Sequence, residues 1–200
     1  MHSLKVYPNL IKDLVIDAPN MVWVSDITYL KIESGFIYLF LITDAYSKKV
    51  VGYCLSDNLQ AINAKKALEK ALEKAQISNE LIHHSDRGIQ YCSKEYVNLL
   101  QKNGIGISMT KGGSPHENAV AERINGILKH ELLNTVELKG ITNAKKAIHK
   151  AITIYNGKRP HLSCNMLTPN QAHDYTTNAL KPLWKNYKKR KIKHILVHNY

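Results

Sequence analysis

Cysteine is scarce in this chain of 200 residues, and its scarcity excludes several kinds of protein. The three cysteines are far apart and form no Cys-x-x-Cys pair; they are Cys54, Cys92 and Cys164. This number and spacing argue against a disulfide scaffold and against a structural zinc site. They fit a reducing compartment such as the cytoplasm.

Long apolar runs are missing as well. The longest is FIYLFLIT (36–43), which is far shorter than the ~20 residues that a helix needs to span a bilayer. The first segment, MHSLKVYPNLIKDL, lacks the apolar core of a signal peptide. We therefore expect a soluble cytoplasmic protein.

Acidic residues are outnumbered by basic ones. The chain has 28 Lys and Arg against 16 Asp and Glu, and its formal net charge is +12. Residues 181–200 hold seven of the basic side chains and no acidic one. A basic segment favours a polyanionic partner, because each phosphate contact releases counterions. A solvated tail without a partner explains the same charge equally well.

Three runs in the first quarter of the chain are rich in β-branched and aromatic residues, which favour strands. The first is MVWVSDITYLKI (21–32), and the other two lie on either side of AYSKK (45–49). The short turns between them predict an antiparallel meander. From Asn58 to Ala75, alanine and leucine recur at spacings of three and four, which predicts an amphipathic helix of about four turns.

Strands and helices alternate in the rest of the chain. The predicted elements are strands over 80–86 and 105–110, and helices over 93–104, from 114 onward, and over about 142–155. Ser93 and Gly104 suit the two ends of the first of these helices, and Ser114 with Glu117 forms a capping box for the second. The order β-β-β-α-β-α-β-α-α predicts an α/β fold. Its five-stranded mixed sheet has three antiparallel strands, then parallel ones, and helices flank it.

Two aspartates stand in positions that are unusual for purely structural residues. Alternation places Asp26 in a mostly apolar row with Val22, Val24 and Leu30. An unpaired buried carboxylate is costly, so Asp26 must meet a cation or lie at an open edge of the sheet. Asp86 lies where a strand passes into a loop, the usual place for a site in an α/β protein. A turn-forming aspartate is an equally good interpretation of Asp86 by itself.

A helical wheel selects a third carboxylate. At about 100° per residue, the core face consists of Val120, Ile124, Ile127, Leu128 and Leu132. Glu122 lies on the opposite side with Lys129 and Gly126, where a nucleic-acid backbone could come close, although an ordinary solvated face looks similar. Glu117, as the cap partner, and Glu131, at the edge of the core face, suit chemistry less well.

Three converging carboxylates would raise one another's pKa values unless a cation joined them. Oxygen ligands, without Cys or His at zinc spacing, indicate a hard divalent ion such as Mg²⁺. Two such ions ~4 Å apart activate a water or a DNA 3′-hydroxyl and stabilise the leaving oxygen of a phosphodiester.

The segments WVSDITYL, HHSDRGIQY and ENAVAERINGILKHEL resemble the three acidic motifs of the integrase core in insertion-sequence transposases and retroviral integrases. Between Asp86 and Glu122 lie 35 residues, the spacing of the D,D(35)E group. DAYSKKVVGY and YNGKRPHLSCNMLTP add two further matches, the second being typical of transposases of the insertion-sequence-three type. The resemblance extends from about Val6 to His173 and implies a ribonuclease H-like fold.

The resemblance also implies an activity. Asp26, Asp86 and Glu122 match the catalytic, metal-binding triad of a DDE transposase, which cleaves DNA ends and transfers strands with two Mg²⁺ ions, for which Mn²⁺ substitutes. Its partners would be mobile-element ends and target DNA, in the cytoplasm of a bacterium. A homo-oligomer on paired ends is the expected assembly.

Further residues match the family's motifs outside the triad. The expected DNA contacts are Gln90, Tyr91, Lys129, Arg159 and His161. A role in closing the core is as good an interpretation of the last two. Asp44 matches a recurrent aspartate outside the triad and is expected to be a turn or structural residue. His83 and His84 point to opposite faces of a strand, so one is expected to be structural and the other near the site.

The chain departs from the family pattern in two ways. Helix-turn-helix and linker regions are expected before the core, whereas this chain begins at the core with a methionine, so recognition of terminal inverted repeats is not expected here. Glu117 and Arg123 stand where relatives often have Asp and Ser. We expect an extension over 1–20, the catalytic core over 21–175 and a basic tail over 176–200.

A binding-only alternative stays open. The missing N-terminal modules suggest a truncated derivative that binds DNA or a transposase and regulates transposition, while the intact triad weighs against it. A junction resolvase of the same fold is disfavoured by the YNGKRPH segment.

Overall fold

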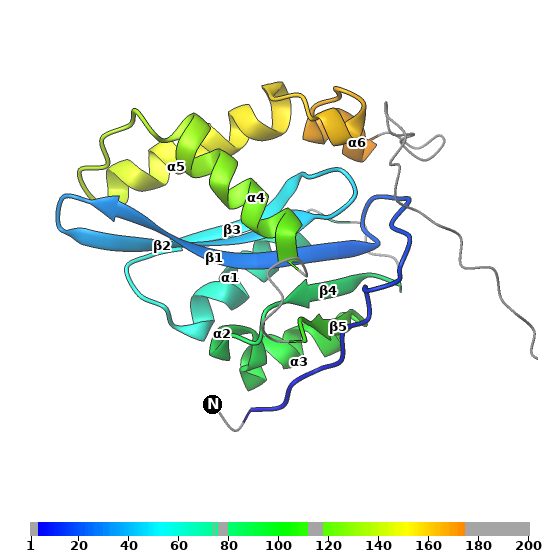
Figure 1. Cartoon of the computed structure of the whole chain (residues 1–200). Helices are drawn as coiled ribbons and strands as arrows, with labels where there is room; N and C mark the ends of the chain where they lie inside the picture. Colours follow the sequence, from blue (N-terminus) through cyan, green and yellow to red (C-terminus); the bar gives the residue numbers. More distant parts are fainter. Residues whose placement is uncertain (1–3, 74, 76–79, 112–117, 175–200) are drawn as a thin grey trace, which may run out of the picture.

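A five-stranded sheet runs through the middle of the molecule (Figure 1). The computed structural model describes residues 4–73, 75, 80–111 and 118–174. The strands are β1 (Val22–Ile32), β2 (Gly35–Asp44), β3 (Val50–Ser56), β4 (Ile82–Ser85) and β5 (Gly106–Met109). Their order is β3-β2-β1-β4-β5, with β1 to β3 antiparallel and β4 and β5 parallel to β1. The predicted mixed sheet is therefore confirmed.

Helices cover both faces of this sheet. Figure 1 shows α1, α2 and α3 on one side and α4, α5 and α6 on the other. Their bounds are α1 (Ala61–Leu72), α2 (Ile89–Cys92), α3 (Lys94–Lys102), α4 (Ala119–Ile127), α5 (Ile141–Lys158) and α6 (Pro169–Asp174). A π-helical turn, η2 (Leu128–Leu132), extends α4, and a 3-10 turn, η3 (Leu162–Cys164), precedes α6. No helix among these described segments is long and apolar enough to cross a membrane.

The two larger hydrophobic cores follow from the alternation of side chains along the strands. Trp23 and Phe40 belong to the core shared with α1 and α3, whereas Leu39 and Leu41 belong to the core shared with α4 and α5. Helix α1 comes close to β3 because Gly52 has no side chain: a Cβ there would lie 2.3 Å from a carbonyl oxygen of α1. The sheet is thus packed against helices on both of its faces.

The predicted helix ends agree with the structure where it describes them. Ser93 accepts a hydrogen bond from the backbone N–H of Tyr96 at the start of α3, and Gly104 has φ +66° just beyond its end. Helix α1 ends about a turn before the predicted limit, and α5 is longer than predicted at both ends. The Ser114–Glu117 capping box and the basic tail lie outside the described residues.

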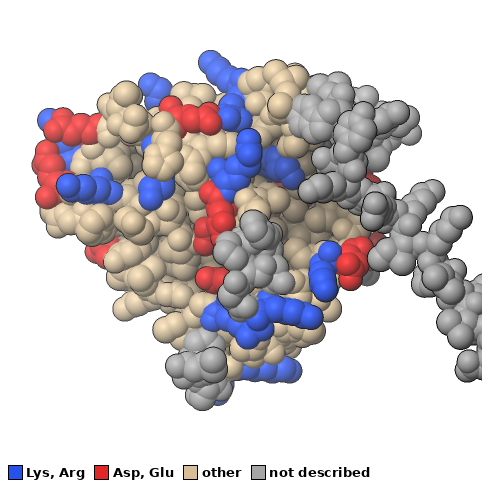
Figure 2. All heavy atoms as spheres, viewed as in Figure 1, with Lys and Arg blue, Asp and Glu red and all other residues tan. Residues whose placement is uncertain are grey.

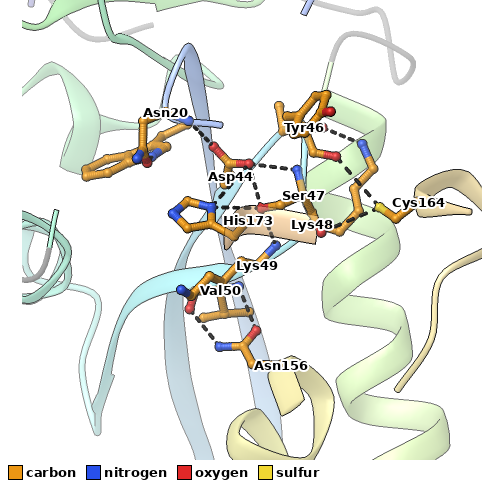
Figure 3. A network of polar contacts seen from close by, with 12 residues as sticks. Asn20, Asp44, Tyr46, Ser47, Lys48, Lys49, Val50, Asn156, Cys164 and His173 are labelled. Carbon is orange, nitrogen blue, oxygen red and sulfur yellow. Dashed lines mark hydrogen bonds and ion pairs between the residues drawn. The ribbon is translucent and has the colours of Figure 1, made fainter. Parts of the chain in front are cut away.

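The turn between β2 and β3 is tied to the C-terminal end of the core (Figure 3). Asp44, fully buried, accepts hydrogen bonds from the backbone N–H of Asn20 (2.8 Å) and from the N–H and hydroxyl of Ser47 (2.7 and 2.6 Å). Ser47 Oγ also lies 3.0 Å from His173 Nδ1 in α6. Asp44 is therefore a structural residue, as predicted, and it anchors α6 to the sheet.

Candidate functional site

The parallel pairing of β1 and β4 brings two of the predicted carboxylates to the same level of the sheet. Val24 pairs with His84, and two residues further along each chain lie Asp26 and Asp86. Asp26 is partly buried within β1, whereas Asp86 is exposed directly after β4. This pairing joins residues that are 60 positions apart in the sequence.

Asp86 is a turn residue and a site candidate at once. Its Oδ1 accepts a hydrogen bond from the backbone N–H of Gly88 at 2.9 Å, which is the geometry of an Asx turn. A Cβ on Gly88 would lie 2.9 Å from the same oxygen, so a larger residue would crowd the turn. The two interpretations of Asp86 are therefore compatible: one oxygen holds the loop and the other is left for a ligand.

Glu122 approaches from the helix layer. It lies in the first turn of α4 and is exposed, while Ile124, Ile127 and Leu128 on the opposite side are buried. A Cβ on Gly126 would meet nothing within 4 Å. The predicted split of this helix into a core face and an open face is confirmed.

The three carboxylates influence one another electrostatically. The pKa of Asp26 is raised to about 6, mainly by burial and also by the charges of Asp86 and Glu122, against hydrogen bonds from Asn125 and the backbone of Ile27 that lower it. Among the described residues, none of the three carboxylates forms an ion pair with a basic side chain. The result is a concentration of negative charge without a protein counter-charge.

The donor set fits a hard divalent cation in its chemistry, since it offers carboxylate oxygens and excess negative charge. As the side chains stand, no three His, Cys, Asp or Glu residues within the described part of the chain are close enough together to hold one ion. Cation binding would therefore require the carboxylates to move toward one another. Relief of their repulsion favours that movement.

Asn125 is a site residue that sequence reasoning missed. It follows Glu122 by three positions, is buried, and donates from its side-chain amide to Asp26 Oδ2 at 2.7 Å. Asn118, just before α4, likewise donates to the backbone oxygen of Ser25 at 2.9 Å. The signal that could have found Asn125 was its place on the helical wheel, between the core face and Glu122.

Both histidines of the second motif are core residues. His83 Nε2 lies 2.6 Å from Ser25 Oγ and 2.8 Å from the Tyr96 hydroxyl, and burial lowers its pKa to about 3. His84 is fully buried, with Nδ1 2.8 Å from Ser108 Oγ. The histidine that we expected near the site is thus part of the core.

Two of the predicted DNA contacts lie at the surface. Gln90 is partly exposed and donates to the carbonyl oxygen of Leu59 at 2.9 Å. The Lys129 amine lies 4.4 Å from the centre of the Tyr29 ring, on the side of the molecule where α4 continues into η2. A ligand could bind either side chain by displacing the one contact described for it.

The other three predicted contacts have structural surroundings. Tyr91 is 3% exposed and packs against Tyr96, so its side chain has no surface for DNA. His161 is 5% exposed and packs on another core tyrosine. Arg159 forms a two-pronged ion pair with Glu131, at 2.7 and 2.9 Å. Because the side chains of Tyr91 and His161 are buried, their expected role as DNA contacts is corrected. For the RPH segment, closing the core is a better interpretation than contacting phosphate.

Comparison with known proteins places this geometry in context. Two family models, both described as an integrase core domain, match residues 17–115 and 103–169. The Insertion element IS600 uncharacterized 31 kDa protein of Shigella sonnei is 36% identical over 84% of this chain and 62% of its own length. The transposase for insertion sequence element IS904 of Lactococcus lactis is 34% identical over 85% of this chain and 68% of its own length. The chain thus spans about two thirds of the length of these curated relatives.

Solved structures of similar fold are retroviral. The HTLV-2 integrase catalytic core domain in complex with magnesium has a TM-score of 0.63 and 22% identity over 78% of this chain and 97% of that one. A chain of the simian T-cell lymphotropic virus intasome has a TM-score of 0.71 and 21% identity over 94% of this chain and 66% of that one. At this identity the likeness concerns the fold, which is ribonuclease H-like as predicted.

Proposed function

The chain belongs to the integrase core family of insertion-sequence transposases, and from this premise we propose that it is the catalytic part of a transposase that cuts and joins DNA. The observation that carries the proposal is that three carboxylates, from β1, the end of β4 and α4, lie near enough to influence one another. Burial and the charges of Asp86 and Glu122 raise the pKa of Asp26, and no basic side chain among the described residues forms an ion pair with any of the three. Such a site is suited to a divalent cation and a phosphodiester.

In this proposal Asp26, Asp86 and Glu122 hold two Mg²⁺ ions, which Mn²⁺ can replace. When bound, the ions lower the pKa of a water or a DNA 3′-hydroxyl and stabilise the leaving oxygen. The protein supplies in-line positioning and forms no covalent intermediate. Asn125 orients Asp26 through its hydrogen bond and so sets the direction from which that carboxylate meets a ligand.

The proposed partners are DNA and other copies of the chain. The proposed DNA contacts from the predicted set are Gln90, four residues after Asp86, and Lys129, seven residues after Glu122. Assembly of several copies on paired element ends, in the cytoplasm of a bacterium, completes the proposal. The homologous transposases and the intasome neighbour support it.

An Asp86→Asn variant tests the function. We expect Mg²⁺-dependent nicking and strand transfer, measured on oligonucleotides that carry the ends of the host element, to fall by at least about a hundredfold, because several kcal/mol of charge stabilisation are lost. Asp57→Asn, at an exposed position directly after β3, is the matched control and should retain activity. Unchanged activity in Asp86→Asn would refute the assignment. DNA binding without cleavage in the unmodified chain would favour the binding-only alternative.

A further inference from the structure

A pocket lies against the first turn of α4, the helix that carries Glu122. It has a volume of about 490 Å³ and is formed between the start of α4, the β2–β3 turn and the segment over 159–166. Its lining includes Val120, Arg123, Lys48, Arg159, Leu162 and Met166. This volume lies in the range of about 300–1,000 Å³ that ligand sites occupy. Because Arg123 follows Glu122 directly on α4, the pocket and the exposed Glu122 lie on adjacent faces of the same helix turn.

The charge of this pocket is of one sign. Three basic side chains line it and no acidic one does, among the residues that the structure describes. His161 also lines the pocket, and its pKa is lowered to about 4 by burial together with the positive charges of Arg159, Lys48 and Arg123. On the face that Figure 2 shows, basic side chains adjoin acidic ones near the middle of the molecule. The pocket is therefore electropositive where the adjacent site is electronegative.

The three basic side chains of the pocket differ in the contacts that they already make within the protein. Arg159 is paired with Glu131, and the Lys48 amine donates to the carbonyl oxygen of Ala45. Arg123 is exposed and has no ion pair or hydrogen bond within the described parts of the chain. A ligand anion would therefore meet Arg123 first.

The outer wall of the pocket is apolar. Leu162 and Met166 line it and are 55% and 52% exposed, so both side chains are accessible to a ligand. Met166 has φ +62° and follows Asn165 at φ +55°, in a tight turn closed by the N–H of Leu167 and the carbonyl oxygen of Cys164 (3.0 Å). Glycine is the unstrained residue at such a position. The turn thus holds a methionine side chain at the pocket at a cost in backbone free energy.

We propose that this pocket binds one unstacked nucleotide of the DNA strand whose phosphodiester occupies the acidic site. Arg123 takes the backbone phosphate, and Leu162 and Met166 contact the base. A nucleotide is the ligand that combines an anion with a flat apolar face, and the pocket offers a partner for each. The proposal rests on the proposed function, because it is the acidic site that brings DNA to this face.

Charge reversal at the pocket gives the first test. The probe is a short DNA duplex with a single-stranded end, and binding is measured by fluorescence anisotropy in EDTA, so that cleavage plays no part. We expect Arg123→Glu to weaken binding about tenfold or more and to lower the salt dependence by about one counterion. Lys102→Glu, an equal charge change at an exposed position on α3, is the matched control. Equal losses in the two variants would overturn the proposal.

Substitution of Met166 tests the apolar contact. Met166→Gly relieves the positive φ, so thermal unfolding should show a fold at least as stable as before. We expect weaker binding to the single-stranded end and unchanged binding to a blunt duplex of the same length. An unchanged affinity for both probes would contradict a base contact.

Cross-linking locates the nucleotide. The three native cysteines are buried, so Met166→Cys adds a single accessible thiol to the described residues. We expect it to form a disulfide with DNA that carries a thiol tether on the single-stranded nucleotides, and not with tethers inside the duplex, whereas Lys102→Cys should react with neither. Cross-linking only inside the duplex would overturn the proposal. If Asp86→Asn still cleaved DNA while Arg123→Glu bound it weakly, the proposed function would fail and the pocket would stand.

Discussion

The side-chain amide of Asn125 donates a hydrogen bond of 2.7 Å to Asp26 Oδ2, and so connects the helix that carries Glu122 to the strand that carries Asp26. A hydrogen bond to the ionised form of a carboxylate lowers its pKa. In this site it opposes burial and the charges of Asp86 and Glu122, which raise the pKa of Asp26 to about 6. Asn125 therefore helps to keep Asp26 ionised near neutral pH.

Removal of that amide should move the pH dependence of the reaction. In Asn125→Ala the hydrogen bond that lowers the pKa of Asp26 is absent, so this pKa should rise. We therefore expect the acidic limb of the pH profile of Mg²⁺-dependent cleavage to shift upward by about one pH unit. Asn63→Ala, which removes a buried amide from α1, is the matched control and should lower stability without moving the profile. A parallel drop in rate at every pH would show that Asn125 acts only on folding.

Neutralising Asp26 should stabilise the protein at neutral pH. Its pKa is about 6 in the folded state against an ordinary value of 3.8, so the folded state binds the proton more tightly and stability falls as pH rises from about 4 to about 6. We expect Asp26→Asn to raise the free energy of unfolding at pH 7.5 by up to roughly 3 kcal/mol and to have little effect below pH 4. Denaturant unfolding at both pH values measures this. Asp57→Asn should show neither effect. If Asp26→Asn were less stable than the unmodified protein at pH 7.5, the raised pKa of Asp26 in the folded state would be contradicted.

Magnesium should stabilise the folded chain through the same carboxylates. A ligand that binds only the folded state adds about 2.7 kcal/mol at a hundred times its Kd, so thermal unfolding at pH 7.5 should shift upward with Mg²⁺ concentration. Glu122→Gln should reduce this shift, whereas Glu33→Gln, in the exposed β1–β2 turn, should not. At pH 5, where Asp26 holds its proton, the shift should be smaller in the unmodified protein. An equal shift in both variants would place the cation elsewhere.

The buried carboxylate of Asp44 should act in the opposite direction on pH dependence. Burial alone would raise its pKa, but the His173 ring, whose Nδ1 lies 3.8 Å from Asp44 Oδ1, and hydrogen bonds from Ser47 and Asn20 outweigh burial and lower it. A lowered pKa contributes stability above about pH 4 that is lost as pH falls through the folded-state value. We expect Asp44→Asn to cost roughly 3 kcal/mol at pH 7 and less in acid, measured by denaturant unfolding. Asp174→Asn, exposed at the end of α6, should be neutral, and an equal loss at all pH values would point to packing alone.

Local periodicity made much of the fold predictable. Alternation in β1 put Asp26 in an apolar row, and the helical wheel put Glu122 opposite Ile124, as the structure has them. Helix caps such as Ser93 could also be predicted from the sequence, because a capping side chain and the backbone N–H that it accepts a hydrogen bond from lie within one turn. These features depend on residues that are close in sequence.

Contacts between distant elements were beyond such reasoning. Tyr91 and His161 were expected at the DNA surface because their segments match family motifs, yet both are buried, and Tyr91 belongs to a core that Trp23 and Phe40 from distant strands help to form. The hydrogen bond from Asn125 to Asp26 joins residues 99 positions apart. The periodicity of a single helix or strand does not predict which buried polar side chain will form a hydrogen bond with which other one.

The sequence by itself determined the order of the elements and the types of residue at the site, because both follow from local backbone preference and from the chemistry of carboxylates. Tertiary structure alone decided that Asp26 and Asp86 stand level, through the parallel pairing of β1 with β4. It also decided that an arginine-lined pocket opens beside Glu122. Both outcomes depend on how whole strands and helices pack, which the pattern within a single element leaves undetermined.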